Sequence, residues 1–121
     1  MKILIVDDED SIRTYVSIVV SELGYEPITA ENGKIGLEKF KQNRPNLIIC
    51  DMIMPVMNGR ELIEKVRQLP EGRTIPIIIL SGYAKISEVA KLLELGATYF
   101  LKKPVEFLEF KEYIKMSLLT K

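Results

Sequence analysis

Leu47-Ile48-Ile49-Cys50-Asp51 is the stretch that decides the fold prediction, and Met52-Ile53-Met54-Pro55 follows it directly. A short apolar run bounded by a charge and a proline predicts a strand buried on both faces, because a half-buried strand would alternate apolar and polar residues. Asp51 then lies where this strand leaves the core. Reactive groups of open parallel α/β sheets lie beyond the carboxyl ends of the strands, so Asp51 is a candidate functional residue. Taken alone, an aspartate in this place is more often a turn residue.

The length and charge of the chain limit the classes of protein to which it can belong. Its 121 residues predict one domain, over residues 1–121, that is large enough for a hydrophobic core. Lysine plus arginine and aspartate plus glutamate each number 17, so no overall basic charge favours nucleic acid or an anionic membrane. No apolar run approaches the roughly 20 residues of a membrane span, and no signal-peptide pattern opens the chain. The expected location is the cytoplasm.

The single cysteine and the missing histidine narrow the chemistry. Cys50 cannot form an internal disulfide, and its place in an apolar run predicts a small buried side chain and not a reactive thiol. The chain contains no histidine, which excludes a Ser-His-Asp unit, a histidine-ligated metal and a phosphohistidine carrier. Carboxylates, hydroxyls and lysines remain as the reactive groups.

Five apolar runs alternate with five segments of helical periodicity. Strands are predicted over residues 2–6, 25–29, 47–51, 75–80 and 98–101. The predicted helices cover 11–23, the segment between 33 and 43, the segment from the 52–58 loop to Pro70, a segment marked by Ile86, Val89, Ala90 and Leu93 that ends at Gly96, and 105 or 106 to about 119. This alternation predicts right-handed crossovers and a parallel sheet with helices on both faces, which is a doubly wound α/β sandwich.

Polar residues follow four of the predicted strands. In a parallel sheet these strand ends share one edge, which brings together Asp7, Asp8, Asp51, Ser81 and Lys103. Neighbouring strands lie about 4.8 Å apart, so carboxylates after adjacent strands can share one cation. Three such carboxylates would raise one another's pKa unless a cation were present, and oxygen ligands without histidine or cysteine suit Mg²⁺. The sequence therefore predicts a magnesium site at this edge.

Each of these residues also has an ordinary structural explanation. The acidic run from Asp7 to Asp10 is a normal start for a helix, because acids suit the positive end of the helix dipole. Ser81-Gly82 is a common turn, and Lys103 by itself is an ordinary solvated charge. The convergence of all of them on one edge favours a functional site over independent turn residues.

The ordered set of motifs resembles the receiver domain of bacterial two-component response regulators over the whole chain. The matching features are Asp7-Asp8 after the first strand, the stretch from Asp51 to Gly59 in the form D-x-x-M-P-x-x-x-G, Ser81, and Lys103-Pro104. The resemblance implies a flavodoxin-like three-layer sandwich with strand order 2-1-3-4-5. Two residues depart from the commonest pattern. Gly82 stands where alanine is usual, and Phe100 lacks the hydroxyl of the frequent tyrosine.

The same resemblance implies a role for each matching residue. Asp51 is expected to be the phosphoacceptor, and the expected Mg²⁺ ligands are Asp7, Asp8, Asp51 and the main-chain carbonyl of Ile53. Ser81 and Lys103 are expected to contact the phosphoryl oxygens, although Lys102 competes for the lysine role. Phe100 is the expected switch aromatic, and the peptide bond before Pro104 is expected to be cis.

The expected function is phosphoryl acceptance on Asp51 from a partner histidine kinase or histidine phosphotransfer protein, followed by a change in effector binding. The effector is expected to bind the face formed by the fourth helix, the fifth strand and the fifth helix. Such a chain is a signalling domain and not an enzyme, apart from its own phosphorylation and dephosphorylation. Two alternatives stay open: a Mg²⁺-dependent phosphohydrolase with an aspartate nucleophile, and a degenerate receiver that only binds a partner. A last helix that ends near Leu119 suits both a complete single-domain regulator and the receiver part of a longer one.

Overall fold

The computed structural model describes residues 1–82 and 85–119. The domain predicted from the sequence covers residues 1–121. Residues 83–84 and 120–121 of that range lie outside the described residues. The elements, in chain order, are β1 Lys2–Val6, α1 Asp10–Glu22, β2 Glu26–Ala30, α2 Gly33–Asn43, β3 Leu47–Asp51, α3 Gly59–Gln68, the 3₁₀ turn η1 Pro70–Gly72, β4 Ile77–Ser81, α4 Ile86–Glu94, β5 Tyr99–Lys102 and α5 Phe107–Leu119.

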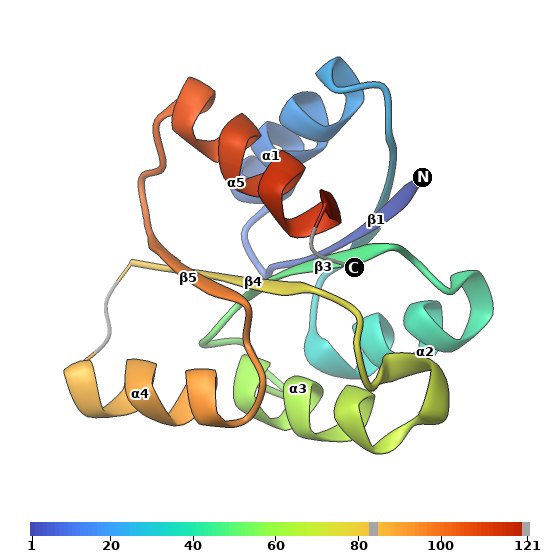
Figure 1. Cartoon of the computed structure of the whole chain (residues 1–121), viewed down its shortest axis with the longest axis vertical. Helices are drawn as coiled ribbons and strands as arrows, with labels where there is room; N and C mark the ends of the chain where they lie inside the picture. The colour runs from blue at the N-terminus through green and yellow to red at the C-terminus, as the bar shows by residue number, and fades with distance from the viewer. Residues whose placement is uncertain (83–84, 120–121) are drawn as a thin grey trace.

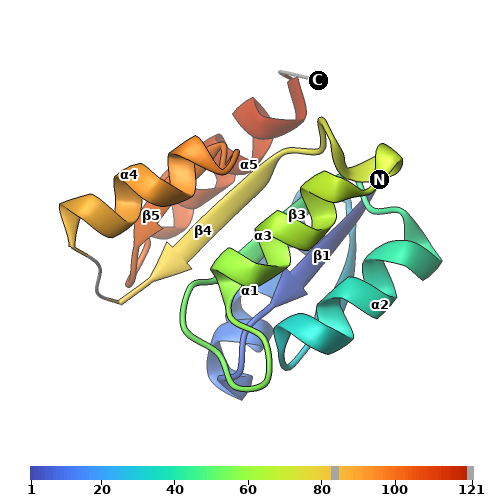
Figure 2. The same ribbon diagram turned by 90° about the horizontal axis from the view of Figure 1, so that it is seen from below.

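The strands form one parallel sheet in the order β2-β1-β3-β4-β5. Helices α1 and α5 cover one face of this sheet, and α2, α3 and α4 cover the other (Figure 1). The view from below shows α2, α3 and α4 lying side by side over the strands (Figure 2). This arrangement confirms the predicted doubly wound α/β sandwich and its strand order.

The sheet separates two hydrophobic clusters. One cluster packs beneath α2, α3 and α4, with Phe40, Leu62 and Val66 among its buried members. The other packs beneath α1 and α5 and includes Phe110 and Ile114. Each fully buried aliphatic or aromatic side chain of this kind contributes about 1.5–3 kcal/mol to folding. The two clusters therefore hold the strands, and with them the carboxyl ends of the strands, in fixed positions.

Strand β3 is buried along its whole length, as its sequence predicts. Cys50 is 1% exposed, which confirms its prediction as a buried side chain, and its thiol donates a hydrogen bond to the carbonyl oxygen of Asp51 at 3.0 Å. Burial raises the pKa of the Cys50 thiol, and the neighbouring charges of Asp51 and Asp7 raise it further. The thiol therefore stays protonated and unreactive at neutral pH.

Glycine ends two of the helices in the way the sequence indicates. Gly24 after α1 and Gly96 after α4 have φ values of +86° and +109°, which favour glycine. After α1, the N–H groups of Gly24 and Tyr25 donate to the carbonyl oxygens of Ser21 and Val20. This pair of bonds is a Schellman motif, and it satisfies carbonyl groups that the helix end would leave unpaired.

Several element boundaries differ from the predicted ones by one or two residues. The fourth strand begins at Ile77 and not at residue 75, because Pro76 has no N–H group to donate to the sheet. Pro76 still accepts a hydrogen bond from Ile48 through its carbonyl oxygen. The second and fifth strands each begin one residue later than predicted, and α5 begins at Phe107.

The apolar residues that mark α4 in the sequence are not its buried face. Leu92 is the buried residue of α4, whereas Ile86 is 89% exposed and Leu93 is 46% exposed. These residues stay exposed because α4 packs on β5, the last strand of the sheet, where fewer elements surround a helix than at α3. Among the described residues, no helix is both long and apolar enough to cross a lipid bilayer.

Candidate functional site

The register of the sheet brings the predicted site residues together at one edge. Val6 of β1 lies opposite Cys50 of β3, so Asp7 and Asp51 follow at neighbouring strand ends. Both aspartates are buried, with 2% and 6% of their surface exposed. A buried carboxylate is costly unless it is paired, so this edge needs compensating positive charge.

Lys103 supplies that charge from the loop after β5. Its Nζ atom lies 2.8 Å from Oδ2 of Asp7, 3.4 Å from Oδ2 of Asp51 and 3.7 Å from Oε1 of Glu9. Lys102, the competing lysine, is exposed at the end of β5. Lys103 is therefore the lysine that contacts the acids.

The mutual influence of these charges shows in their pKa values. Burial raises the pKa of Asp51 above its ordinary value, and the charge of Asp7 raises it further, while Lys103 and the amide of Met52 act in the opposite direction. Burial alone would lower the pKa of Lys103, but its hydrogen bond to Asp7 and the charges of Asp51, Asp7 and Glu9 outweigh that effect and raise it. One ammonium thus only partly neutralises the carboxylates, and the site favours additional positive charge.

Four carboxylates form the part of the site that could hold a metal ion. Oxygen atoms of Asp7, Asp8, Glu9 and Asp51 all lie within 4.8 Å of one another. A set made only of carboxylate oxygens matches hard divalent cations such as Mg²⁺. The donor set therefore fits the predicted ion.

Glu9 is the site residue that sequence reasoning missed. It is the N-cap residue of α1, yet its side chain makes no capping hydrogen bond. Instead its backbone N–H donates to Oδ1 of Asp7 at 2.9 Å, and its carboxylate turns toward Lys103. Its place directly after the acidic pair was the available signal.

Asp51 is held by the loop that follows it. Its Oδ1 atom accepts a hydrogen bond from the Met52 amide at 2.8 Å, so Oδ2 is the oxygen on the Lys103 side. The first residue of α3, Gly59, donates from its N–H group to the carbonyl oxygen of Met52 at 2.9 Å. A Cβ atom on Gly59 would collide with the carbonyl oxygen of Asp51, which explains the glycine of the D-x-x-M-P-x-x-x-G motif. Asn58 and Glu61 start α3 with a capping box that fixes the end of this loop.

The remaining predicted residues lie at different depths around this centre. Ser81 is buried at the end of β4, and its carbonyl oxygen accepts a hydrogen bond from the Lys103 amide at 2.8 Å. Phe100 is half-buried and packs against the cluster beneath α2, α3 and α4. The Ile53 side chain is 65% exposed, away from the core. The peptide bond between Lys103 and Pro104 is cis, which is the geometry that the resemblance implies.

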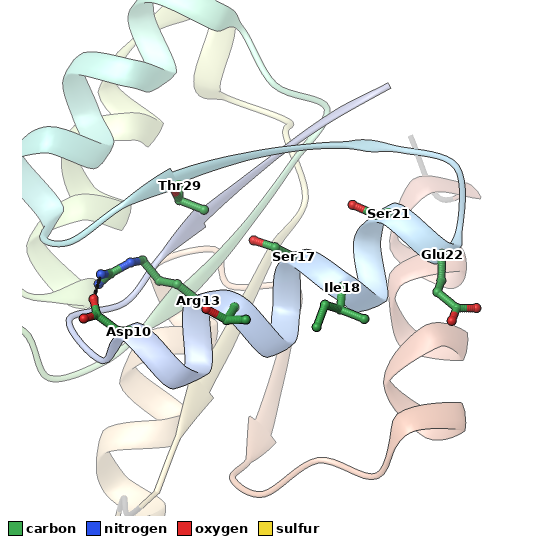
Figure 3. Close-up of a pocket in the computed structure, with 8 residues that line it drawn as sticks. Asp10, Arg13, Ser17, Ile18, Ser21, Glu22 and Thr29 are labelled. Atoms are coloured by element: carbon green, nitrogen blue, oxygen red, sulfur yellow. Dashed lines mark hydrogen bonds and ion pairs between the residues drawn. The ribbon is translucent and has the colours of Figure 1, made fainter.

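A hollow of about 860 Å³ runs along the outer side of α1, between Asp10 and Glu22, and reaches Thr29 of β2 (Figure 3). Arg13 lies at the end of this hollow where α1 begins, and it forms an ion pair with Asp10 there (Figure 3). The Arg13 guanidinium also donates to the carbonyl oxygen of Asp7 at 2.6 Å. Through this hydrogen bond, a side chain on the outer side of α1 contacts the backbone of Asp7, one of the site acids.

Comparison with known proteins identifies the family. The family model described as "Response regulator receiver domain" matches residues 3–115. The chain is similar to the solved structure of chemotaxis protein CheY4 from Vibrio cholerae, with a TM-score of 0.92 and 34% identity over 97% of this chain and 98% of that one. It is 33% identical to sporulation initiation phosphotransferase F from Bacillus subtilis (strain 168), over 97% of this chain and 93% of the relative.

A longer relative shows the same unit within a larger protein. The probable transcriptional regulator ycf27 of Porphyridium aerugineum is 35% identical over 97% of this chain, but the match spans only 48% of that relative. The match over residues 3–115 and the shared fold lead to one conclusion. This chain belongs to the response regulator receiver domain family of two-component signalling systems.

Proposed function

We propose that this chain accepts a phosphoryl group on Asp51 from a phosphohistidine of a partner histidine kinase or histidine phosphotransfer protein. The observation that carries the proposal is the position of Lys103 Nζ, within 3.4 Å of Asp51 Oδ2 and 2.8 Å of Asp7 Oδ2. An ammonium beside an unprotonated carboxylate suits transfer of an anionic group to that carboxylate. The donor histidine belongs to the partner, because this chain has none.

The transfer is an in-line displacement at phosphorus. A carboxylate oxygen of Asp51 forms the new P–O bond, the P–N bond to the donor imidazole breaks, and the imidazole nitrogen keeps the electron pair. Lys103 and the Ser81 hydroxyl are the groups of this chain that contact the transferred oxygens. Phosphorylation changes the charge on the Asp51 side chain from about one negative charge to about two at neutral pH. The Lys103 ammonium neutralises part of this increase.

The cluster of carboxylates at the sheet edge is the proposed Mg²⁺ site. Its proposed ligands are the side chains of Asp7, Asp8 and Asp51 and the main-chain carbonyl of Ile53. A bound Mg²⁺ supplies positive charge next to the transferring phosphoryl group, which a cluster of carboxylates otherwise repels. Glu9 joins these ligands because its carboxylate lies in the same group. Four carboxylates with one lysine leave a net negative charge, and a divalent cation offsets most of it.

Phosphorylation is proposed to change the surface that binds an effector protein. The new phosphoryl oxygens attract the Ser81 hydroxyl, and Phe100, half-buried on the next strand, turns inward as the loop moves. The surface affected is formed by α4, β5 and α5. Exposed Leu93 on α4 gives this surface an apolar contact for a partner.

The unit proposed to carry out these steps is one receiver domain over residues 1–121, acting in the cytoplasm. It signals by its phosphorylation state and does not turn over a substrate, apart from its own phosphorylation and dephosphorylation. It binds neither nucleic acid nor membrane directly, which agrees with its balanced charge.

Intact-protein mass spectrometry after incubation with acetyl phosphate tests the proposal. The expected result is one added phosphoryl group that requires Mg²⁺ and is lost in Asp51→Asn. Asp10→Asn is the matched control, since Asp10 is an exposed acid of the same run, and it should still form the adduct. Absence of an adduct in the unmodified protein would overturn the proposal. Steady release of phosphate from a phosphate ester over many turnovers would favour the phosphohydrolase alternative instead.

A further inference from the structure

Tyr15 on α1 makes a contact with the lysine-bearing loop that the family motifs do not include. Its hydroxyl donates a hydrogen bond to the carbonyl oxygen of Val105 at 3.0 Å, across 90 positions of sequence. The ring stacks on Phe110 with an interplanar angle of 22° and meets the edge of Phe107 at 61°. The aromatic contacts fix the ring on the core, so the hydroxyl has a defined position.

The Val105 carbonyl belongs to the segment that sets the direction of Lys103. This segment is part of the connection between β5 and α5, residues 103–106. At the start of the segment, the Lys103 amide donates a hydrogen bond to the Ser81 carbonyl oxygen at 2.8 Å. Pro104 has no N–H group and cannot donate a backbone hydrogen bond. The Tyr15 hydroxyl therefore holds the backbone on the C-terminal side of the lysine, through its hydrogen bond to the Val105 carbonyl oxygen.

Lys103 needs such an anchor because of its own flexibility. A lysine carries a point charge on four flexible carbons, so its ammonium is well placed only when its backbone and stem are held. A crevice of about 300 Å³ has Tyr15, Lys103, Val105 and Phe110 among its walls. Tyr15 and the lysine thus line the same cavity, and the hydroxyl fixes one of its walls.

Helix α1 also holds the acidic partner of this lysine. Arg13, two residues before Tyr15, donates to the carbonyl oxygen of Asp7, and Asp7 accepts the hydrogen bond from Lys103. Burial raises the pKa of Tyr15, and the charge of Glu106 raises it further, so the hydroxyl stays protonated and able to donate at neutral pH. One rigid helix thereby sets the separation of the acid and the lysine.

We propose that Tyr15 is a positioning residue for Lys103: its hydroxyl, by holding the Val105 carbonyl, keeps the lysine ammonium between Asp7 and Asp51. The part of this inference that concerns transfer rate rests on the proposed phosphoacceptor function. The part that concerns the lysine position does not.

Tyr15→Phe is the test variant, since it removes the hydroxyl and keeps the stacked ring. Tyr113→Phe is the matched control, because it removes a hydroxyl from another tyrosine packed on the same hydrophobic cluster. With acetyl phosphate and Mg²⁺, Tyr15→Phe should slow formation of the adduct about three- to tenfold, as expected for the loss of one hydrogen bond. Tyr113→Phe should leave the rate unchanged.

A double-mutant cycle separates positioning from general destabilisation. In a Lys103→Met background the further change Tyr15→Phe should have no effect on the rate, because the group that Tyr15 positions is absent. An equal slowing in both backgrounds, or no slowing in either, would overturn the inference.

A measurement that needs no phosphorylation completes the test. In NMR spectra, the ε-methylene signal of Lys103, assigned by its loss in Lys103→Met, should shift in Tyr15→Phe and stay in place in Tyr113→Phe. An unshifted signal in Tyr15→Phe overturns the inference whatever the rates show. A shifted signal in a protein that forms no adduct supports the positioning role and counts against the phosphoacceptor function alone.

Discussion

The Nζ atom of Lys103 lies 2.8 Å from Oδ2 of Asp7, which joins the loop after β5 to the loop after β1 across 96 positions of sequence. The lysine is 13% exposed and the aspartate side chain 3% exposed, so water screens their attraction only weakly. The same ammonium faces Asp51 at 3.4 Å. It is thus the positive charge on which two buried carboxylates depend.

Replacement of Lys103 by methionine should lower the free energy of unfolding by about 2–4 kcal/mol, because it leaves Asp7 and Asp51 buried without their partner. Lys102→Met is the control, since Lys102 is exposed, and its effect should stay within about 0.5 kcal/mol. Urea denaturation followed by circular dichroism measures both. Millimolar Mg²⁺ should restore part of the loss in Lys103→Met. Equal effects of the two substitutions would contradict the assignment of Lys103 as the structural counter-charge.

Asp51→Asn should stabilise the metal-free protein at neutral pH. The pKa of Asp51 is raised above its ordinary value of 3.8, chiefly by burial, so ionisation of this carboxyl costs more in the folded than in the unfolded state. The wild-type protein therefore loses stability relative to Asp51→Asn as the pH rises from about 3.8 through the raised pKa. Thermal unfolding at a series of pH values should show the difference in Tm vanishing at the acidic end and growing toward neutrality. A constant difference at all pH values would exclude Asp51 titration as its cause.

Most of this site could be predicted because its elements are set by local patterns. Apolar runs that stop at Asp7, Asp51 and Ser81 define strand ends, and parallel topology then places those ends at one edge. Glu9 could not be assigned in this way. Its direction depends on the hydrogen bond between its amide and the Asp7 side chain, a geometric detail inside a run of four acids.

The outward face of α4 was also beyond sequence pattern alone. Periodicity identifies an apolar stripe, but whether the stripe is buried depends on how much sheet lies beneath the helix. At the end of the sheet, Leu92 is buried, whereas Ile86 and Leu93 stay exposed. Strand boundaries shifted for similar reasons, as at Pro76, where the missing N–H group and not the apolar run decides the first paired residue.

Gly59→Ala should destabilise the protein by about 1–3 kcal/mol, the usual cost of overpacking. The new methyl group would collide with the carbonyl oxygen of Asp51 and lie 3.0 Å from the Cα atom of Met52. Gly82→Ala is the control, since a Cβ atom there meets nothing within 4 Å. It should be neutral or stabilising by up to about 1 kcal/mol. Chemical denaturation measures both, and a neutral Gly59→Ala would show that the loop after β3 can move away without cost.

Glu9→Gln should weaken Mg²⁺ binding without abolishing it. Glu9 is one of four carboxylates in the site, but its side chain is 60% exposed, so solvent screening limits its contribution. We expect the Kd for Mg²⁺, measured by titration of NMR signals at the sheet edge, to rise about two- to fivefold. Asp10→Asn provides the comparison, because Asp10 is an acid of the same run that pairs with Arg13. If Asp10→Asn weakens binding as much as Glu9→Gln, the effect belongs to the overall charge of the run and not to the position of Glu9 beside Lys103.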